Sequence, residues 1–304
     1  MYAMILKHRT KPDELIVLEL LDKRSELSSK DMQYLFNLKK GYEGELLFDN
    51  LTEQLQCECL LLNGLLLEVN NTTFQIDTLT LINGKTHFYE VKNYEGDFYY
   101  EANKLFKKPK QEVSNPLLQI NRSETLLNQL LRNHGYHLPI EASVVFINPS
   151  FTLYQAPLNL PAILPTQLTK YMNTLDANPV KINEKQKKIA DLLMSLHITK
   201  SPFTKVPNYT YQQFRKGITC EKCDSFSVVV EGKKCKCKEC EHKESVTNAV
   251  LRSVKEYQIL FPEEKITTNL IYDWCQVVPT KKWIRQILKK SYKLVGVHQW
   301  AYFE

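Results

Sequence analysis

Two apolar, β-rich runs joined by a short turn constrain the fold of this 304-residue chain more than any other feature. The first run is Phe74–Ile82 and the second is Lys85–Lys92, with Asn83-Gly84 between them. An Asn-Gly pair between two strand-like runs predicts a tight β-hairpin, because both residues tolerate a positive φ angle. The chain is therefore expected to contain a pair of antiparallel strands at this point.

Three charged residues lie within this predicted hairpin. Asp77 interrupts the first run, and Glu90 and Lys92 are two positions apart in the second. Side chains alternate along a strand, so Glu90 and Lys92 share a face, and Asp77 can meet them across the sheet. Two carboxylates can hold a hard divalent cation, and an ammonium group can orient or activate a water molecule. The pattern favours hydrolysis of a phosphodiester bond, although a lone Glu-x-Lys on a strand is more often a solvated face.

A glycine-rich motif, Gly41-Tyr-Glu-Gly-Glu45, precedes the hairpin. The leucines that follow it (Leu46, Leu47 and Leu51) suggest an amphipathic helix that begins near Glu43. Taken alone, Glu45 would be a surface residue of this helix.

A second helix is predicted after the hairpin, from Pro116 to about Leu131. Proline favours the first turn of a helix, and Asn115 is a suitable N-cap. Gln119 lies on this helix, where an isolated glutamine would need no functional explanation.

Together these motifs resemble the PD-(D/E)xK phosphodiesterase superfamily, and more narrowly the nuclease-related domain (NERD) family. The resemblance covers roughly residues 35–150, and the motifs occur in the family's order: Gly41 to Glu45, Asp77, Glu90 with Lys92, and Asn115-Pro116 with Gln119. One departure is Ile76, which stands where the superfamily's name has a proline, at a position that varies widely.

The resemblance implies an α/β, restriction-endonuclease-like fold, with a mixed central sheet flanked by helices. It also implies a nuclease that hydrolyses DNA with Mg²⁺ or Mn²⁺. Asp77 and Glu90 would bind the cation, with Glu45 as an additional ligand. Lys92 would position water and stabilise charge on the phosphate, and Gln119 would contact the substrate backbone or the water. Endonuclease and exonuclease action both fit these motifs.

Five of the eight cysteines fall between residues 220 and 240, which predicts a metal site rather than disulfides. Two Cys-x-x-Cys knuckles, Cys220/Cys223 and Cys237/Cys240, flank a strand-like run and a Gly232 turn. This layout predicts a zinc ribbon over about residues 215–243, with a structural Zn²⁺ held by four thiolates. Cys235 is a fifth candidate that could replace Cys237.

The last segment, about residues 244–304, resembles a winged helix-turn-helix. A helix is expected over Lys243–Leu260, two shorter helices over Ile266–Cys275 and Thr280–Ser291, and a strand-like region over Lys293–Phe303. Five basic residues on the last helix are expected to face solvent and bind nucleic acid: Lys281, Lys282, Arg285, Lys289 and Lys290. A solvated basic helix face is the alternative.

The positive charge of the chain is concentrated in this region. Residues 201–304 hold 18 Lys+Arg and 11 Asp+Glu, whereas residues 1–200 hold 22 and 23. A basic module beside a nearly neutral domain is typical of a polyanion-binding segment attached to a catalytic one.

Length and hydropathy complete the expectations. A chain of this length predicts about two domains, and we place them at residues 1–200 and 210–304, with a linker at 200–208. No run approaches the length of a membrane span, and no signal-peptide pattern opens the chain, so a cytoplasmic location is expected.

The expected partner is DNA, with RNA ranked lower because no stacked-aromatic RNA-binding strand is apparent. A homo-oligomer is compatible with the sequence. The rival interpretation is a non-catalytic DNA-binding regulator or processing factor built on a nuclease-like scaffold.

Overall fold

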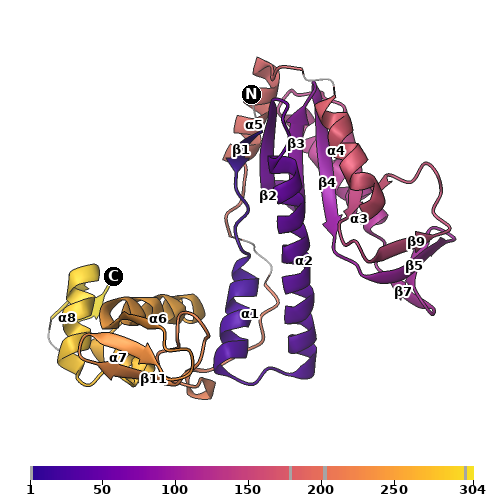
Figure 1. Ribbon diagram of the computed structural model, residues 1–304. Helices are drawn as coiled ribbons and strands as arrows, with labels where there is room; N and C mark the ends of the chain where they lie inside the picture. Colours follow the sequence, from indigo (N-terminus) through magenta and orange to yellow (C-terminus); the bar gives the residue numbers. More distant parts are fainter. Residues whose placement is uncertain (1–2, 178–179, 201–203, 298–299) are drawn as a thin grey trace. The chain divides into compact units, whose positions relative to one another are not determined.

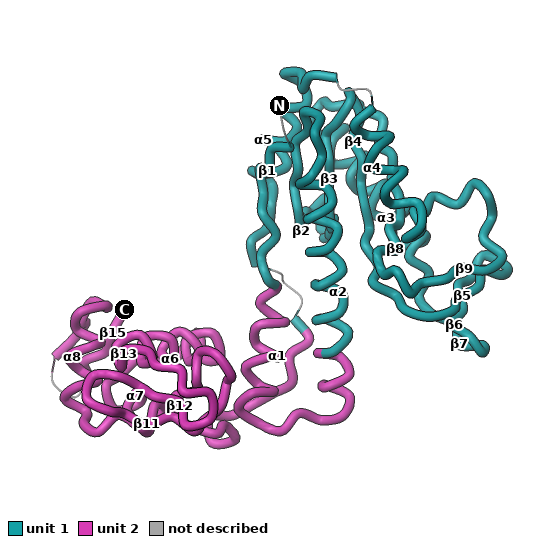
Figure 2. Tube along the Cα trace, viewed as in Figure 1, with its two compact units in different colours: residues 1–11, 36–204 teal, residues 12–35, 205–304 magenta. Residues whose placement is uncertain are grey.

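The computed structural model describes residues 3–177, 180–200, 204–297 and 300–304. Its contacts divide the chain into two compact units, shown in Figure 2. Unit 1 comprises residues 1–11 and 36–204, and unit 2 comprises residues 12–35 and 205–304. The predicted division near residue 200 stays a prediction, and residues 201–203 of the predicted linker lie outside the described residues. Contacts group the N-terminal residues 12–35 with unit 2.

A six-stranded mixed sheet forms the centre of unit 1, in the order β1-β2-β3-β4-β8-β10. The β2–β3 and β3–β4 pairs are antiparallel, and the β1–β2, β4–β8 and β8–β10 pairs are parallel. The bounds are β1 Met4–Lys7, β2 Cys59–Val69, β3 Thr72–Ile82, β4 Lys85–Lys92, β8 Ile140–Phe146 and β10 Ala162–Ile163.

Helices cover both faces of this sheet (Figure 1). On one face, α2 (Ser29–Glu53) and α4 (Leu168–Asp176) pack against the strands, α4 following the 3-10 turn Pro165–Gln167. On the other face lie α3 (Pro116–Asn133) and α5 (Glu184–Ser195). The predicted α/β class, with a mixed central sheet flanked by helices, is confirmed.

The central hairpin forms as its sequence predicts. Asn83 and Gly84 adopt φ angles of 51° and 76°, which a two-residue hairpin turn requires. The pairing of β3 with β4 runs from Ile82↔Lys85 to Thr78↔Tyr89 and stops there. Asp77 therefore lies just beyond the point where these two strands separate.

A second, four-stranded sheet follows β4, in the order β7-β6-β5-β9. Its strands are β5 Gly96–Glu101, β6 Lys104–Lys107, β7 Gln111–Val113 and β9 Phe151–Tyr154. Phe98 and Phe151 join the core beneath α3, with ring centroids 5.2 Å apart. This sheet therefore continues the core of unit 1.

Unit 2 combines the N-terminal helix α1 (Asp13–Arg24) with the C-terminal third of the chain. A 3-10 turn at Tyr211–Gln213 precedes a three-stranded antiparallel sheet. The further elements are β11 Val228–Glu231, β12 Lys234–Cys237, β13 Lys243–Ser245, α6 Val246–Leu260, α7 Thr268–Cys275, α8 Lys281–Ser291, β14 Leu294–Val295 and β15 Tyr302–Phe303.

Arg24 anchors α1 inside unit 2. Its guanidinium is fully buried, forms an ion pair with Glu256 of α6, and lies 4.3 Å from the Trp274 ring centroid. It also donates to the backbone oxygens of Arg215 and Gly217, at 3.1 and 3.2 Å. A buried arginine requires this many acceptors, because an uncompensated buried charge is strongly destabilising.

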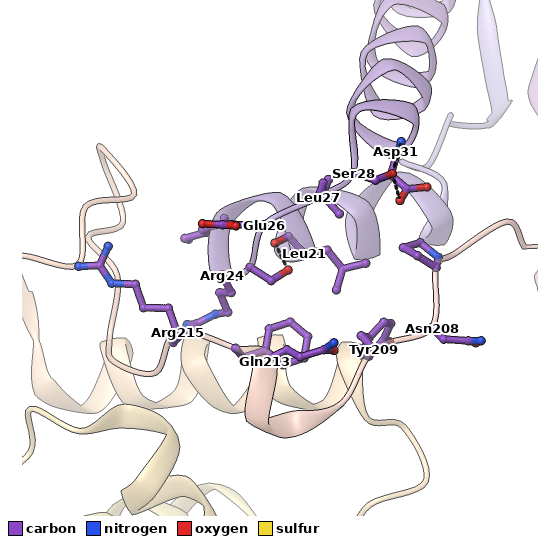
Figure 3. A pocket seen from close by; sticks show the side chains of 14 residues that line it. Leu21, Arg24, Glu26, Leu27, Ser28, Asp31, Asn208, Tyr209, Gln213 and Arg215 are labelled. Carbon is purple, nitrogen blue, oxygen red and sulfur yellow. Dashed lines mark hydrogen bonds between the residues drawn. The ribbon is translucent and has the colours of Figure 1, made fainter.

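A cavity of about 850 Å³ lies beside Arg24 (Figure 3). Its lining comes from α1, from the turn that follows it and from residues 207–215. Several of the charged groups around it are engaged within the protein: Lys23 pairs with Asp224 at 2.5 Å, and Asp31 accepts from Ser28 Oγ at 2.6 Å. The size of this cavity therefore does not by itself identify a reactive site.

Several predicted boundaries were wrong. The helix expected to begin near Glu43 is the second half of α2, which continues from Ser29 without a break. The helix expected from Lys243 begins at Val246, because Lys243–Ser245 pairs with β12 as a strand. Of the strand-like C-terminal region, residues 298–299 lie outside the described residues. Within the part that is described, no helix has the length and apolar character needed to cross a membrane.

Candidate functional site

The separation of β3 from β4 creates the site's central hydrogen bond. Asp77 Oδ2 accepts from the backbone N–H of Val91 at 2.8 Å, in place of a strand carbonyl. Asp77 Oδ1 accepts from Gln75 Nε2 at 3.3 Å. The carboxylate is therefore held at the fork between the strands, with its side chain almost completely buried.

Glu90 and Lys92 extend from β4 at the same fork. Lys92 Nζ donates to Glu90 Oε1 at 2.7 Å and to Gln119 Oε1 of α3 at 3.2 Å. Glu90 is only 2% exposed, and its Oε2 has no hydrogen-bond partner among the described residues. A buried carboxylate oxygen without a donor is costly, so Oε2 calls for a further positive group.

Glu45 reaches the site from α2. Its Oε2 accepts a hydrogen bond from Nη1 of Arg9 at 2.5 Å. Arg9 lies just after strand β1. Together, Glu45, Asp77, Glu90, Lys92 and Gln119 line one cavity of about 510 Å³ in unit 1. The structure thus brings together all five residues singled out from the sequence, and the roles assigned to them stay predictions.

The three carboxyl groups of this cavity resist ionisation. Burial raises the pKa of Asp77. Burial and the charge of Asp77 raise the pKa of Glu90 to about 7, and the same two causes raise that of Glu45 to about 8. Hard oxygen donors crowded in this way, with one oxygen unpartnered, fit a divalent cation, whose binding releases protons from its ligands.

Gly44 explains why α2 can approach the site so closely. A Cβ atom added to Gly44 would lie 2.6 Å from Cβ of Asn93, which directly follows β4. Gly41 is different, because a Cβ there would meet no atom within 4 Å. Of the two glycines in the motif, Gly44 is therefore the one that packing requires, and it brings the neighbouring Glu45 to the cavity.

The predicted zinc ligands lie together in unit 2. The sulfur atoms of Cys220, Cys223, Cys237 and Cys240 all lie within 4.8 Å of one another. The Cys220–Cys240 and Cys223–Cys237 separations are 3.5 and 3.6 Å, close to the edge of about 3.8 Å expected for tetrahedral zinc thiolates. These four thiols could hold a metal ion.

Cys235 does not join this cluster. It is buried, and burial raises the pKa of its thiol to about 11. Cys237 has the opposite environment, because the backbone N–H of Cys240 lowers its pKa to about 7. Metals bind the thiolate, so Cys237 is the better ligand.

The predicted nucleic-acid-binding residues lie on α8, whose buried side is formed by Ile284, Ile287 and Leu288. All five basic residues are exposed. None of them has an ion pair with a carboxylate within the described residues. Lys281, Lys282 and Arg285 also line a cavity of about 420 Å³ with Thr267–Asn269, Leu294, Ala301 and Phe303.

Sequence reasoning missed Arg9 and Asp49. Arg9 stands in the polar run His8-Arg9-Thr10-Lys11, which has the composition of a solvated segment. Asp49 follows Glu45 by one helical turn on α2, so the two carboxylates share a helix face. That spacing was the available indication that a cation lies between them.

Comparison with protein families gives one match. Residues 40–147 match the model of the family described as the nuclease-related domain. This range contains Glu45, Asp77, Glu90, Lys92 and Gln119, so the resemblance stated from the motifs is confirmed for this part of the chain. Comparisons with curated proteins and with solved structures find no match.

The two glycines of α2 provide a test of the packing. We expect Gly44→Ala to lower the free energy of unfolding by about 1–3 kcal/mol, because it forces a methyl group against Asn93. Gly41→Ala should leave stability unchanged or raise it by up to about 1 kcal/mol, since alanine favours a helix. Thermal and urea unfolding measure the stability of both variants. Equal changes in the two variants would contradict the conclusion that packing requires a glycine at position 44 and not at position 41.

The cysteine cluster predicts one zinc ion per chain. Cys237→Ala should lose the metal, whereas Cys235→Ala should retain it, because only Cys237 lies with the other three thiols. Elemental analysis of the purified variants measures the stoichiometry. Loss of zinc from the Cys235 variant alone would reverse the assignment.

Proposed function

We propose that the nuclease-related domain of this chain is a metal-dependent nuclease that hydrolyses DNA phosphodiester bonds. The observation that carries the proposal is the buried Oε2 of Glu90, which lacks a partner among the described residues beside Asp77 and Lys92. Glu90 lines a polar cavity with Asp77 and Lys92, and an unsatisfied carboxylate oxygen in such a residue is what a cation-binding hydrolase requires.

Asp77 and Glu90 would hold the cation, with Glu45 as an additional ligand. When bound, Mg²⁺ or Mn²⁺ would supply Lewis-acid stabilisation of the phosphoryl oxygens. All three residues offer carboxylate oxygens, which hard cations of this kind prefer over nitrogen or sulfur.

Lys92 would act as a positive charge rather than as a base. Burial alone would lower its pKa, but Glu90 and Asp77 outweigh that effect, and the pKa of Lys92 is raised. Its protonated ammonium, held by Glu90 and Gln119, would orient the attacking water and stabilise charge on the phosphate. Water attacks phosphorus, and the bond to the leaving sugar oxygen breaks.

The C-terminal segment of unit 2 would bind the nucleic acid. Helices α7 and α8, followed by the β14–β15 hairpin, have the element order of a winged helix-turn-helix, whose second helix enters the major groove. The five basic residues of α8 would contact phosphates, and the thiol cluster would hold a structural Zn²⁺. A cytoplasmic location and a homo-oligomer stay predictions.

The first test is cleavage of supercoiled plasmid DNA with Mg²⁺ or Mn²⁺. We expect nicking that EDTA abolishes and that Lys92→Ala slows by about 100- to 1000-fold, the usual cost of removing a group that stabilises transition-state charge. Lys85→Ala is the matched control, because Lys85 lies at the far end of the same strand and pairs with the exposed Glu141. It should cleave at the wild-type rate.

The outcomes of this assay separate the candidate functions. Cleavage that survives both EDTA and Lys92→Ala would contradict the mechanism. DNA binding without cleavage in either metal would favour the regulator or processing factor. A parallel assay with RNA distinguishes the two nucleic acids.

The second test concerns α8. A triple variant, Lys281→Ala with Lys282→Ala and Arg285→Ala, should weaken DNA binding and flatten its salt dependence. The slope should fall by about 0.9 for each phosphate that the variant no longer neutralises. Removing three exposed lysines of the ribbon (Lys233, Lys234 and Lys238) controls for net charge. Binding titrations at several salt concentrations measure both, and an equal weakening by the two variants would contradict a specific role for α8.

A further inference from the structure

Arg9 is the most heavily bonded side chain at the cavity, and its side chain is only 3% exposed. Its guanidinium forms a two-pronged pair with Asp49, at 2.7 and 2.8 Å. It also donates to Glu45 Oε2 at 2.5 Å, to the backbone oxygen of Asp77 at 2.7 Å and to Thr78 Oγ1 at 3.2 Å. One side chain thus joins the loop after β1 to helix α2 and to the fork of β3.

The backbone of β2 is irregular beside this guanidinium. The pairs Asn63↔Thr78 and Leu65↔Ile76 place Gly64 opposite Asp77. Gly64 has a φ angle of 65°, a conformation that other residues rarely adopt, and a Cβ there would lie 3.6 Å from Arg9 Nη1. The irregular point of the β2–β3 pair is therefore where Arg9 contacts the sheet.

The groups around Arg9 are those that a hard cation would use. Two carboxylates, from Glu45 and Asp49, and the backbone oxygen of Asp77 surround it. Carboxylate and carbonyl oxygens are typical ligands of Mg²⁺ and Mn²⁺. The guanidinium occupies the position between them with a permanent positive charge, because arginine stays protonated in proteins.

The charges of the cavity then balance with one divalent ion. Four carboxylates gather here (Glu45, Asp49, Asp77 and Glu90), and Arg9 and Lys92 form ion pairs within this group. Lys40 also lines the cavity, but its charge is paired with Glu95. When all are ionised, two negative charges remain, which a single divalent cation neutralises. A second divalent ion would leave an excess of two positive charges in a largely buried site, which is unfavourable.

We infer that Arg9 is a positioning residue that fixes Glu45 and Asp77 at the cavity and stands in place of a second cation, so that the site takes one divalent ion. The inference rests on the cation binding of the proposed function and goes beyond it. Arg9 acts through Glu45 and Asp77 and does not itself touch the substrate.

Binding of Mn²⁺ to the full, zinc-loaded chain tests the inference without any catalytic readout. Isothermal titration and electron paramagnetic resonance should give one Mn²⁺ per chain, and Asp77→Asn should abolish it. If the wild-type chain binds two Mn²⁺ ions and Asp77→Asn loses both, the exclusion of a second ion is overturned. No cavity-bound Mn²⁺ at all would overturn both this inference and the proposed metal dependence.

Variants of the Arg9–Asp49 pair test the positioning role. The double variant Arg9→Leu with Asp49→Leu removes one charge of each sign, so the net charge of the cluster is kept while Glu45 loses the partner that positions it. We expect its Mn²⁺ affinity to fall by about 10- to 100-fold, the usual cost of removing a group that orients a metal ligand. Arg9→Lys keeps the positive charge but lacks the two-pronged guanidinium, so its Mn²⁺ affinity should lie between that of the double variant and that of the wild type. The exposed pair Glu184→Ala with Lys187→Ala is the matched control and should bind like the wild type.

The outcomes are distinguishable from those of the cleavage assay. Wild-type affinity in a folded double variant would show that Arg9 has only a structural role, and would overturn its positioning role while leaving the nuclease proposal intact. A third outcome is that the wild type binds one Mn²⁺ per chain and the double variant binds it more weakly, but no DNA is cleaved. This would support the positioning role of Arg9 and contradict the proposed nuclease activity. If the double variant does not fold, the Mn²⁺ affinity of Arg9→Lys still tests the positioning role of Arg9. The Mn²⁺ stoichiometry of the wild type still tests the exclusion of a second ion.

Discussion

The hydrogen bond from the Val91 N–H to the Asp77 carboxylate is the interaction on which the site depends. In a regular antiparallel pair this N–H would point to a strand carbonyl, but pairing between β3 and β4 ends at Thr78↔Tyr89. The carboxylate satisfies the donor that the separation leaves free, so the strands can part without an unpaired buried group. At this gap, Glu45 from α2 on one face of the sheet and Gln119 from α3 on the other line one cavity. Val91 packs on the α2 side, whereas Lys92 reaches Gln119 on the α3 side.

Two glycines make this opening compatible with a packed core. Gly44 allows α2 to lie directly against Asn93, and Gly64 allows β2 to bend opposite Asp77. Gly44 removes a side chain that would clash with Asn93, and Gly64 supplies a positive φ angle that other residues rarely adopt. The cost of the polar cluster is limited by pairing, because Arg9 bonds the carboxylates of Glu45 and Asp49, Lys92 bonds that of Glu90, and Gln75 with the Val91 N–H bonds that of Asp77. Among the described residues that line the cavity, Glu90 is the one with a buried side-chain oxygen that lacks a partner.

Local chemistry was predictable from the sequence, and long-range pairing was not. The Asn83-Gly84 turn and the Asn115 cap formed as expected, because their signals lie within a few residues. The course of α2 was misjudged, since a helix was expected to begin near Glu43, whereas α2 runs without a break from Ser29 to Glu53. Its leucines also misled: Leu46 and Leu47 are largely exposed, and Phe48 and Asp49 are buried instead. Arg9 could not be placed, because its partners lie 36 to 69 positions away.

The chain separates its two kinds of metal ligand by chemistry. Unit 1 gathers carboxylate oxygens beside a cavity, where a weakly held, partly hydrated hard cation could still exchange and meet a substrate. Unit 2 gathers four thiols that would fill every position of a tetrahedral ion, leaving none for a reactant. Thiolates are ligands that select zinc, whereas carboxylate oxygens suit magnesium or manganese. Under the proposed function, the chain would use one ion for chemistry and one for folding, each held by the donor type that suits it.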